Sequence, residues 1–191
     1  MRWVTVSLGV AAVLLAGCTQ STGIALPDPP APAAVTTPAV PTADPSSPVP
    51  LGTTLAVAEA GAQLEVTVFN INQDGAPNSA PKSGGHWASA DVQTCVKQTQ
   101  SDFATKATDW AVSDAAGLAS QGTILTDASF PSPTYPISQP LGVGQCVRGW
   151  TLFPVDYKAV VSTVGYAPES GPAAVWEVSS GKVASDQSLP S

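Results

Sequence analysis

Gly144-Gln145-Cys146-Val147-Arg148-Gly149-Trp150-Thr151-Leu152-Phe153-Pro154-Val155 is the stretch that decides the fold. Small or apolar side chains fill most of the odd positions from Val147 to Val155, which is the periodicity of a β-strand with one buried face. A glycine-flanked turn at 142–144 comes directly before it. The alternation predicts a strand that covers part of a hydrophobic core.

Shorter segments with the same texture lie on both sides of this stretch. In 64–68 the apolar side chains fall on even positions and the polar ones on odd positions, and 88–96 repeats the pattern. Further strands are expected at 110–112, 122–126, 158–166 and 173–178. Residues 94–107 offer the only helical alternative, which their threonines and serines disfavour. Roughly seven or eight short strands without a long helix predict an all-β sandwich over residues 51–178.

The N-terminus has the pattern of a bacterial lipoprotein signal peptide. Arg2 precedes an apolar run that is short for a membrane-spanning helix and typical of a signal peptide. The run ends in Leu15-Ala16-Gly17-Cys18, a lipobox, in which small residues precede the cysteine that carries the lipid. We expect removal of residues 1–17 and anchoring of Cys18 on the extracytoplasmic face of the bacterial cell membrane. An ordinary signal peptide with a chance cysteine and a short uncleaved anchor are the alternatives.

Residues 18–50 are expected to form a disordered tether that holds the domain away from the lipid. Prolines recur from Pro27 to Pro50, so no periodic apolar face can form. The cluster Pro27-Asp28-Pro29-Pro30 is a weaker candidate for a proline-motif ligand. At the other end of the chain, the polar residues 179–191 are expected to be a flexible tail.

The chain has three cysteines, and this odd number is explained if Cys18 carries lipid. Cys95 and Cys146 then remain as one pair, and export permits a disulfide between them. The bridge would close a loop of about 50 residues and contribute roughly 4 kcal/mol in the chain-entropy model. Two buried free thiols are the alternative.

Strand parity indicates where this bridge lies. Cys95 is out of phase with the apolar positions of 88–96, and Cys146 is out of phase with those of 147–155. We therefore predict a bridge on the outer face of one sheet, rather than one buried between two sheets. The same parity places on that outer face Trp87, Asp91, Arg148 and Trp150.

The stretch 144–155 resembles the telokin-like, immunoglobulin-like domains of actinobacterial and mycobacterial lipoproteins and small secreted antigens. Its Gly-x-x-Val-x-Gly-aromatic-x-x-Phe pattern carries the resemblance. Further matching features are Trp87 followed by Ala90-Asp91-Val92, Cys95, the spacing Trp110…Asp114-x-x-Gly117, and Tyr166…Trp176-Glu177-Val178. The resemblance covers about Leu51 to Val178 and implies an immunoglobulin-like antiparallel β-sandwich, an exported and surface-attached protein, and no catalytic residues. Alanine and serine replace bulkier residues of the family at several strand positions.

Composition and residue types exclude several functions. The net charge is −7 and the few cations are scattered, so we expect no nucleic-acid binding. His86 is the only histidine, and a surface or structural role is more common than a general base, so we expect no enzyme. We expect no cofactor and no metal. A calcium site at Asn72, Asp74 and Asn78 is the alternative to an ordinary turn.

The binding candidates are Trp87, Arg148 and Trp150. If both indoles are exposed beside Arg148, the three form an aromatic and cationic patch of the kind that anchors partners. The alternative is that the two tryptophans pack on each other and cover the disulfide.

These features together predict a monomeric, lipid-anchored, non-enzymatic envelope protein that presents a β-sandwich binding module. The candidate partners are the membrane, through the lipid, and another envelope protein or polymer. The alternative function is a carrier of a small molecule or lipid in a cavity between the two sheets.

Overall fold

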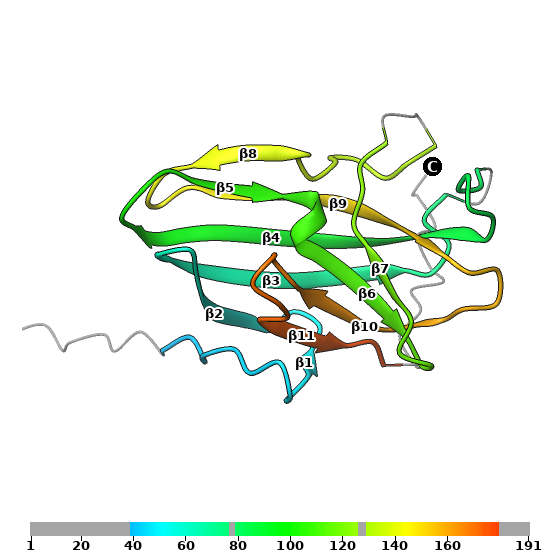
Figure 1. Cartoon of the computed structure of the whole chain (residues 1–191), viewed down its shortest axis with the longest axis horizontal. Coiled ribbons are helices and arrows are strands. Elements are labelled where there is room, and N and C mark those ends of the chain that lie inside the picture. The colour runs from blue at the N-terminus through cyan, green and yellow to red at the C-terminus, as the bar shows by residue number, and fades with distance from the viewer. Residues whose placement is uncertain (1–38, 77–78, 126–128, 180–191) are drawn as a thin grey trace, which may run out of the picture. The chain divides into compact units, whose positions relative to one another are not determined.

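The computed structural model describes residues 39–76, 79–125 and 129–179, and nearly all of its regular structure is β (Figure 1). The strands in chain order are β1 (Val49–Pro50), β2 (Thr54–Glu59), β3 (Ala62–Asn72), β4 (His86–Thr99), β5 (Phe103–Lys106), β6 (Trp110–Asp114), β7 (Ala119–Gln121), β8 (Ser138–Leu141), β9 (Cys146–Val155), β10 (Val161–Tyr166) and β11 (Ala174–Glu177). A single 3₁₀ turn, η1 (Ala107–Asp109), joins β5 to β6. The segment with the helical alternative therefore belongs to β4, β5 and this turn.

Sheet A has the strand order β2-β3-β4-β9, and all of its neighbours are antiparallel. The predicted alternation is confirmed, because the even-numbered side chains of β4 from Ala88 to Val96 are fully buried. In β9 the opposite parity faces the core, and Phe153 is fully buried. The decisive stretch of sequence is thus the edge strand of sheet A, paired along its length with β4.

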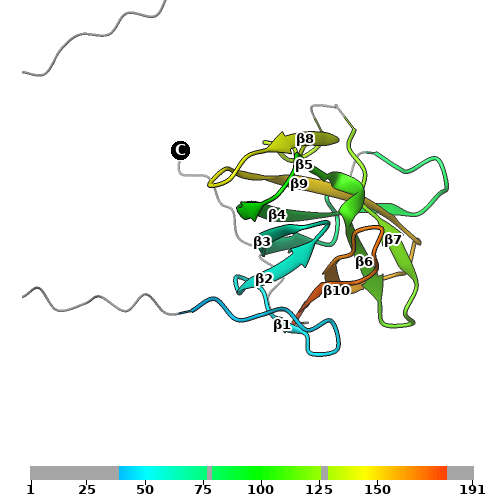
Figure 2. The same cartoon turned by 60° about the vertical axis from the view of Figure 1, so that its left-hand side comes forward.

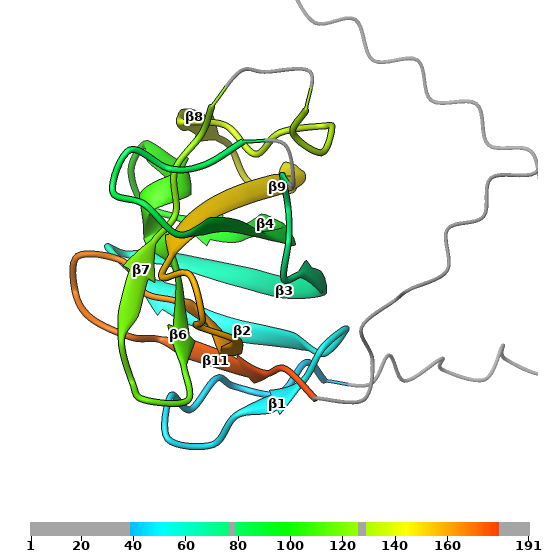
Figure 3. The ribbon, with the colours of Figure 1, turned by 90° about the vertical axis from the view of Figure 1, so that its right-hand side faces the viewer.

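Sheet B has the order β1-β11-β10-β6-β7 and faces sheet A (Figures 2 and 3). All its neighbours are antiparallel except β1, which runs parallel to β11. The space between the sheets is filled by large side chains that are less than 2% exposed, among them Trp110, Trp176, Tyr135, Tyr166 and Phe153. The fold is therefore an immunoglobulin-like β-sandwich, and the packed aromatic layer gives no support to a carrier cavity between the sheets.

A small third sheet pairs β5 with β8 and lies beside β9 (Figure 1). Between them and sheet A lies Tyr135, whose hydroxyl donates to Thr94 Oγ1 at 2.8 Å and also hydrogen-bonds to Thr105. These hydrogen bonds satisfy a hydroxyl that is buried at the centre of the core.

The ordered domain begins earlier than the sequence pattern indicated. Ala43 N donates to Ala56 O, and Ala56 N donates to Pro41 O, both at 2.8 Å, so residues 41–43 pair with β2. β1 then pairs with β11. The expected boundary at Leu51 is wrong because backbone pairing at a sheet edge needs no apolar pattern and tolerates proline. Cys18, residues 1–17 and residues 180–191 lie outside the described residues.

No helix within the described ranges is long and apolar enough to cross a membrane.

Candidate functional site

The disulfide joins Cys95 and Cys146 at the end of the β4–β9 ladder. The two cysteines are direct register partners, and Cys146 is exposed while Cys95 is 8% exposed. Gln93, two residues before Cys95 on the same face, donates from Nε2 to Cys95 Sγ at 3.1 Å. The predicted bridge between neighbouring strands, on the outer face of sheet A, is confirmed.

Of the two arrangements considered for the tryptophans, exposure of both indoles does not hold for Trp87. Its side chain is on the outer face of sheet A as the parity predicted, but it is only 6% exposed. The ring of Phe130 packs edge-on against it with centroids 5.9 Å apart, and Ala76 and Leu152 complete this small outer core. Sequence alternation could not show that the loop before β8 folds back over one end of the sheet.

Trp150 is half-buried and lies further along the same face, opposite Asp91. Its backbone holds the segment before β8, because Trp150 N donates to Pro133 O and Tyr135 N donates to Trp150 O, both at 2.8 Å. Trp87 packs against Phe130, so the two indoles do not form the expected pair over the disulfide. The disulfide lies eight residues along β4 from Trp87.

Arg148 forms the centre of the site. Its Nε donates to Asp91 Oδ1 at 3.0 Å and its Nη2 donates to Asp91 Oδ2 at 2.6 Å, a bidentate pair. The guanidinium carbon lies 3.7 Å from the centroid of the Phe69 ring. We name these three residues, Phe69, Asp91 and Arg148, the Arg148 platform.

The Arg148 platform spans three strands of sheet A. Arg148 comes from β9, Asp91 from the neighbouring β4, and Phe69 from β3 beyond it. The hydrogen bonds that Arg148 donates to Asp91 raise the pKa of Arg148 above its ordinary value, so the cation persists at every physiological pH. Because the carboxylate neutralises the guanidinium, the platform carries no net charge, and its guanidinium plane is held in one orientation.

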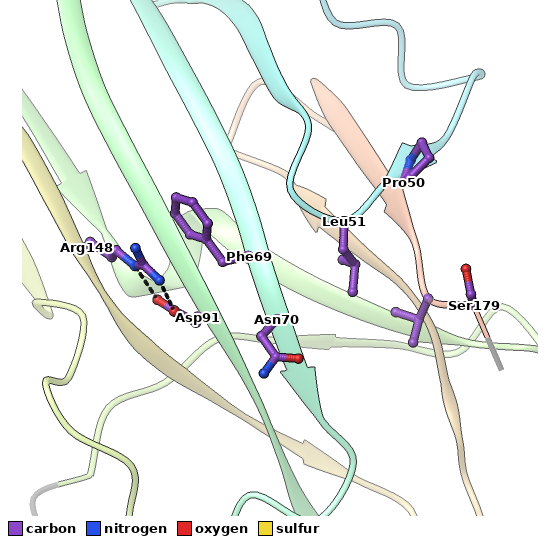
Figure 4. Close-up of a pocket in the computed structure, with 8 residues that line it drawn as sticks. Pro50, Leu51, Phe69, Asn70, Asp91, Arg148 and Ser179 are labelled. Carbon is purple, nitrogen blue, oxygen red and sulfur yellow. Dashed lines mark hydrogen bonds and ion pairs between the residues drawn. The ribbon is translucent and has the colours of Figure 1, made fainter. Parts of the chain in front are cut away.

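A hollow of about 530 Å³ opens beside the platform (Figure 4). Leu51, Asn70 and Val178 line it together with the platform, and Pro50 and Ser179 complete its wall. Figure 4 shows the Arg148–Asp91 pair on one side of this hollow and Leu51 on the other. The arrangement places the N–H donors of the fixed Arg148 guanidinium next to an apolar wall. Such a site suits a ligand that carries a polar group attached to an apolar one.

Phe69 is the site residue that sequence reasoning missed. The register of β3 against β4 shifts between Val68 and Asn70, which marks a β-bulge. Val68 before the bulge and Ile71 after it are both buried, so the buried parity changes from even to odd. That change is visible in Val68-Phe69-Asn70-Ile71 and is the signal that could have located the bulge.

The remaining candidates from the sequence lie elsewhere. His86 begins β4, at the far end of the ladder from the disulfide. Asn72 accepts a hydrogen bond from Asp74 N at 3.0 Å, as in an ordinary turn, and Asn78 lies outside the described residues. In the part of the chain that the structure describes, no three His, Cys, Asp or Glu side chains are placed to hold a metal ion.

Fold and site together define an immunoglobulin-like β-sandwich with a mixed polar and aromatic outer face. No protein-family model matches the chain, and no curated protein matches it in sequence. Among solved structures, MPT63, a secreted protein from Mycobacterium tuberculosis, is similar at 16% identity with a TM-score of 0.52. The match covers 70% of this chain and 99% of that protein, and at this identity it shows the fold alone.

A second solved structure, the yjhA protein from Bacillus subtilis, matches at 12% identity with a TM-score of 0.42. The match covers 63% of this chain and 81% of that protein.

Proposed function

We propose that the chain is a lipid-anchored, non-enzymatic binding module of the bacterial cell envelope. It belongs, on this proposal, with the telokin-like lipoproteins that its sequence resembles. The β-sandwich is carried outside the membrane, and the Arg148 platform with its hollow binds another envelope protein.

Export and anchoring are supported by the sequence at the N-terminus. Leu15-Ala16-Gly17-Cys18 provides the lipobox, and the apolar run before it has the length of a signal peptide. The disulfide agrees with folding in an oxidising compartment. The fold shared with MPT63, which is a secreted protein, is in line with this location.

The single observation that carries the binding role is the Arg148 platform. An arginine held in two hydrogen bonds and stacked on a ring loses little conformational entropy when a partner binds. Arginine and aromatic side chains are also the residues that most often dominate protein interfaces. The half-buried ring of Trp150 extends this surface along β9.

A non-enzymatic role is supported by the position of the titratable groups. His86 lies at the opposite end of the β4–β9 ladder from the cysteines. The Arg148–Asp91 pair satisfies its own charge.

The test is chemical crosslinking in intact cells that produce the full-length tagged protein. We compare the wild type with Arg148→Ala and Trp150→Ala, two changes at half-exposed or exposed positions. The matched control is Lys97→Ala, because Lys97 also forms an outer-face ion pair, with Glu65 at 3.3 Å, but lies outside the platform.

The proposal expects one crosslinked species whose recovery falls about tenfold in both Arg148→Ala and Trp150→Ala, corresponding to about 1.4 kcal/mol of binding free energy. Recovery with Lys97→Ala stays at the wild-type level. Equal recovery from all four proteins would overturn the binding role of the platform. Anchoring is tested separately with Cys18→Ser, since a variant that stays with the membrane fraction contradicts lipidation at that residue.

A further inference from the structure

A second hollow, of about 730 Å³, lies at the end of the sandwich where β4 begins and β9 ends. The β4–β9 ladder runs from the His86–Val155 pair at this end to the disulfide at the opposite end, roughly 30 Å away at about 3.4 Å per residue. Residues 73–74, 79–80 and 85–86, around the β3–β4 connection, line one side of the hollow, and residues 157–160, between β9 and β10, line the other. We call it the loop hollow, and its lining includes Asp74, His86, Tyr157, Lys158 and Val160.

The walls of the loop hollow are held by specific contacts. The side chain of Gln73 hydrogen-bonds to both the N–H and the C=O of Val161, at 2.9 and 3.0 Å, and so ties the start of β10 to the end of β3. Gly75 N donates to Trp87 O at 2.6 Å. The Gln73 bonds therefore tie the two sides of the hollow together, and the Gly75 bond holds the β3–β4 connection to β4.

Gly85 shows how closely the two loops approach. A Cβ at Gly85 would lie 2.0 Å from the carbonyl oxygen of Val155, and its φ of +88° is one that other residues rarely adopt. Only glycine therefore allows the chain entering β4 to pass this close to the end of β9.

Two side chains at the rim of the loop hollow expose large apolar surfaces to solvent. Tyr157 is 81% exposed and Val160 is 64% exposed. Among the described residues, no ring pair or cation–ring contact includes Tyr157. Tyrosine offers a large contact surface at a low cost in side-chain entropy, which makes an exposed ring at a hollow a typical contact residue.

The polar groups of the loop hollow have no net charge preference. The carboxylate of Asp74 and the ammonium of Lys158 balance each other, and the other polar side chains around the hollow both donate and accept hydrogen bonds. A strongly charged ligand finds no excess of the opposite sign here. A ligand with a C–H face for the ring and hydroxyls for the mixed polar groups fits this lining.

We infer that the loop hollow binds a neutral oligosaccharide, with a sugar ring packed against Tyr157. The hydroxyl groups of the sugar hydrogen-bond to Asp74, His86 and Lys158. The inference goes beyond the proposed function, because it depends neither on the Arg148 platform nor on its partner.

The test is saturation-transfer NMR on the full chain in detergent micelles with maltotriose, cellotriose, chitotriose and an arabinotriose as probes. We expect at least one of these sugars to bind with a Kd near about 1 mM, the range of a single shallow site. Tyr157→Ala should weaken that binding about tenfold, and Tyr157→Phe should keep it because the ring remains. The matched control Leu118→Ala removes another exposed apolar side chain, on the neighbouring β6–β7 turn, and should leave binding unchanged.

Arg148→Ala should also leave sugar binding unchanged, which separates this result from a failure of the proposed function. Absence of binding by all four sugars up to about 20 mM would overturn the inference. So would equal binding by the wild type and Tyr157→Ala, or binding of a short peptide at the hollow in place of the sugars. Circular dichroism of Tyr157→Ala confirms that the variant is folded.

Discussion

The side chain of Gln73 and the backbone of Val161 form a closed pair of hydrogen bonds between the two sheets. Gln73 Nε2 donates to Val161 O at 3.0 Å, and Val161 N donates to Gln73 Oε1 at 2.9 Å. Gln73 follows β3 of sheet A and Val161 begins β10 of sheet B. The side-chain amide of Gln73 thus supplies the two hydrogen bonds that a neighbouring strand would make with Val161. It does so at a point where β10 has a register irregularity against β6.

Gln73→Glu should destabilise the protein more than its nearly identical shape suggests. A carboxylate can accept from Val161 N but cannot donate to Val161 O, so a buried carbonyl loses its partner and faces a negative charge. We expect a loss of about 1–3 kcal/mol in the free energy of unfolding, measured by urea denaturation at pH 7. The control is Gln121→Glu, an exposed position in β7. Equal stabilities of the two variants would show that the bonds between Gln73 and Val161 contribute nothing.

Removing the disulfide should lower stability without changing the fold. The double variant Cys95→Ser/Cys146→Ser frees a loop with a sequence separation of 51 residues, which corresponds to about 4 kcal/mol in the chain-entropy model. The backbone pairing of β4 with β9 and the core beneath remain, so the far-UV circular dichroism should be unchanged. An unfolding midpoint that is identical in the double variant and in the oxidised wild type would contradict this prediction.

The alternation of Leu64 to Val68, of Ala88 to Val96 and of Val147 to Val155 was sufficient to predict three strands of sheet A and the outer position of the disulfide. Such strands are predictable because one face is buried and the other is not. β8 was not predicted: its residues Ser138, Gln139 and Pro140 are exposed, and a strand with little buried surface leaves no apolar period in the sequence.

The candidate site was predictable only in part. Arg148 and Asp91 were placed on the correct face by parity, but their pairing across β4 and β9 depends on the register, which one sequence does not specify. Parity placed Trp87 on the outer face, but alternation assigns only a side to a residue. Trp87 is buried because a distant loop residue, Phe130, covers that side.

Gly149→Ala should separate the segment before β8 from β9. A Cβ at this position would lie 2.5 Å from Tyr135 N and 2.6 Å from the carbonyl carbon of Thr134, so backbone must move. The movement would break the hydrogen bond from Tyr135 N to Trp150 O and displace a fully buried tyrosine. We expect a loss of about 1–3 kcal/mol in the free energy of unfolding, from thermal or urea denaturation.

The matched control for Gly149 is Gly165→Ala in β10. Its Cβ would lie 3.5 Å from the nearest atom, the carbonyl oxygen of Ala174, which is ordinary contact. The control should therefore change stability by less than about 0.5 kcal/mol. A smaller effect at Gly149 than at Gly165 would contradict the close approach seen here.

Glu59→Gln should change how stability depends on pH. The hydroxyl of Tyr166 in sheet B donates to the carboxylate of Glu59 in sheet A. Burial nevertheless raises the pKa of Glu59 above its ordinary value of 4.5, and burial also raises the pKa of the neighbouring Asp109. The folded protein therefore binds protons more tightly at these carboxyls than the unfolded chain does, and the wild type loses stability as the pH rises from about 4.5 through the raised values.

Glutamine keeps an oxygen that accepts from Tyr166 but cannot ionise, so Glu59→Gln removes the part of this loss that Glu59 contributes. The free energy of unfolding of the wild type, relative to the variant, should then decrease between about pH 4 and about pH 7. The control Glu177→Gln, at an exposed position of β11, should follow the wild type across the range. Parallel curves for the wild type and Glu59→Gln would show that burial of this carboxyl does not govern its proton affinity. If the double variant Glu59→Gln/Asp109→Asn flattens the pH dependence of the free energy of unfolding further, the remaining pH dependence belongs to Asp109.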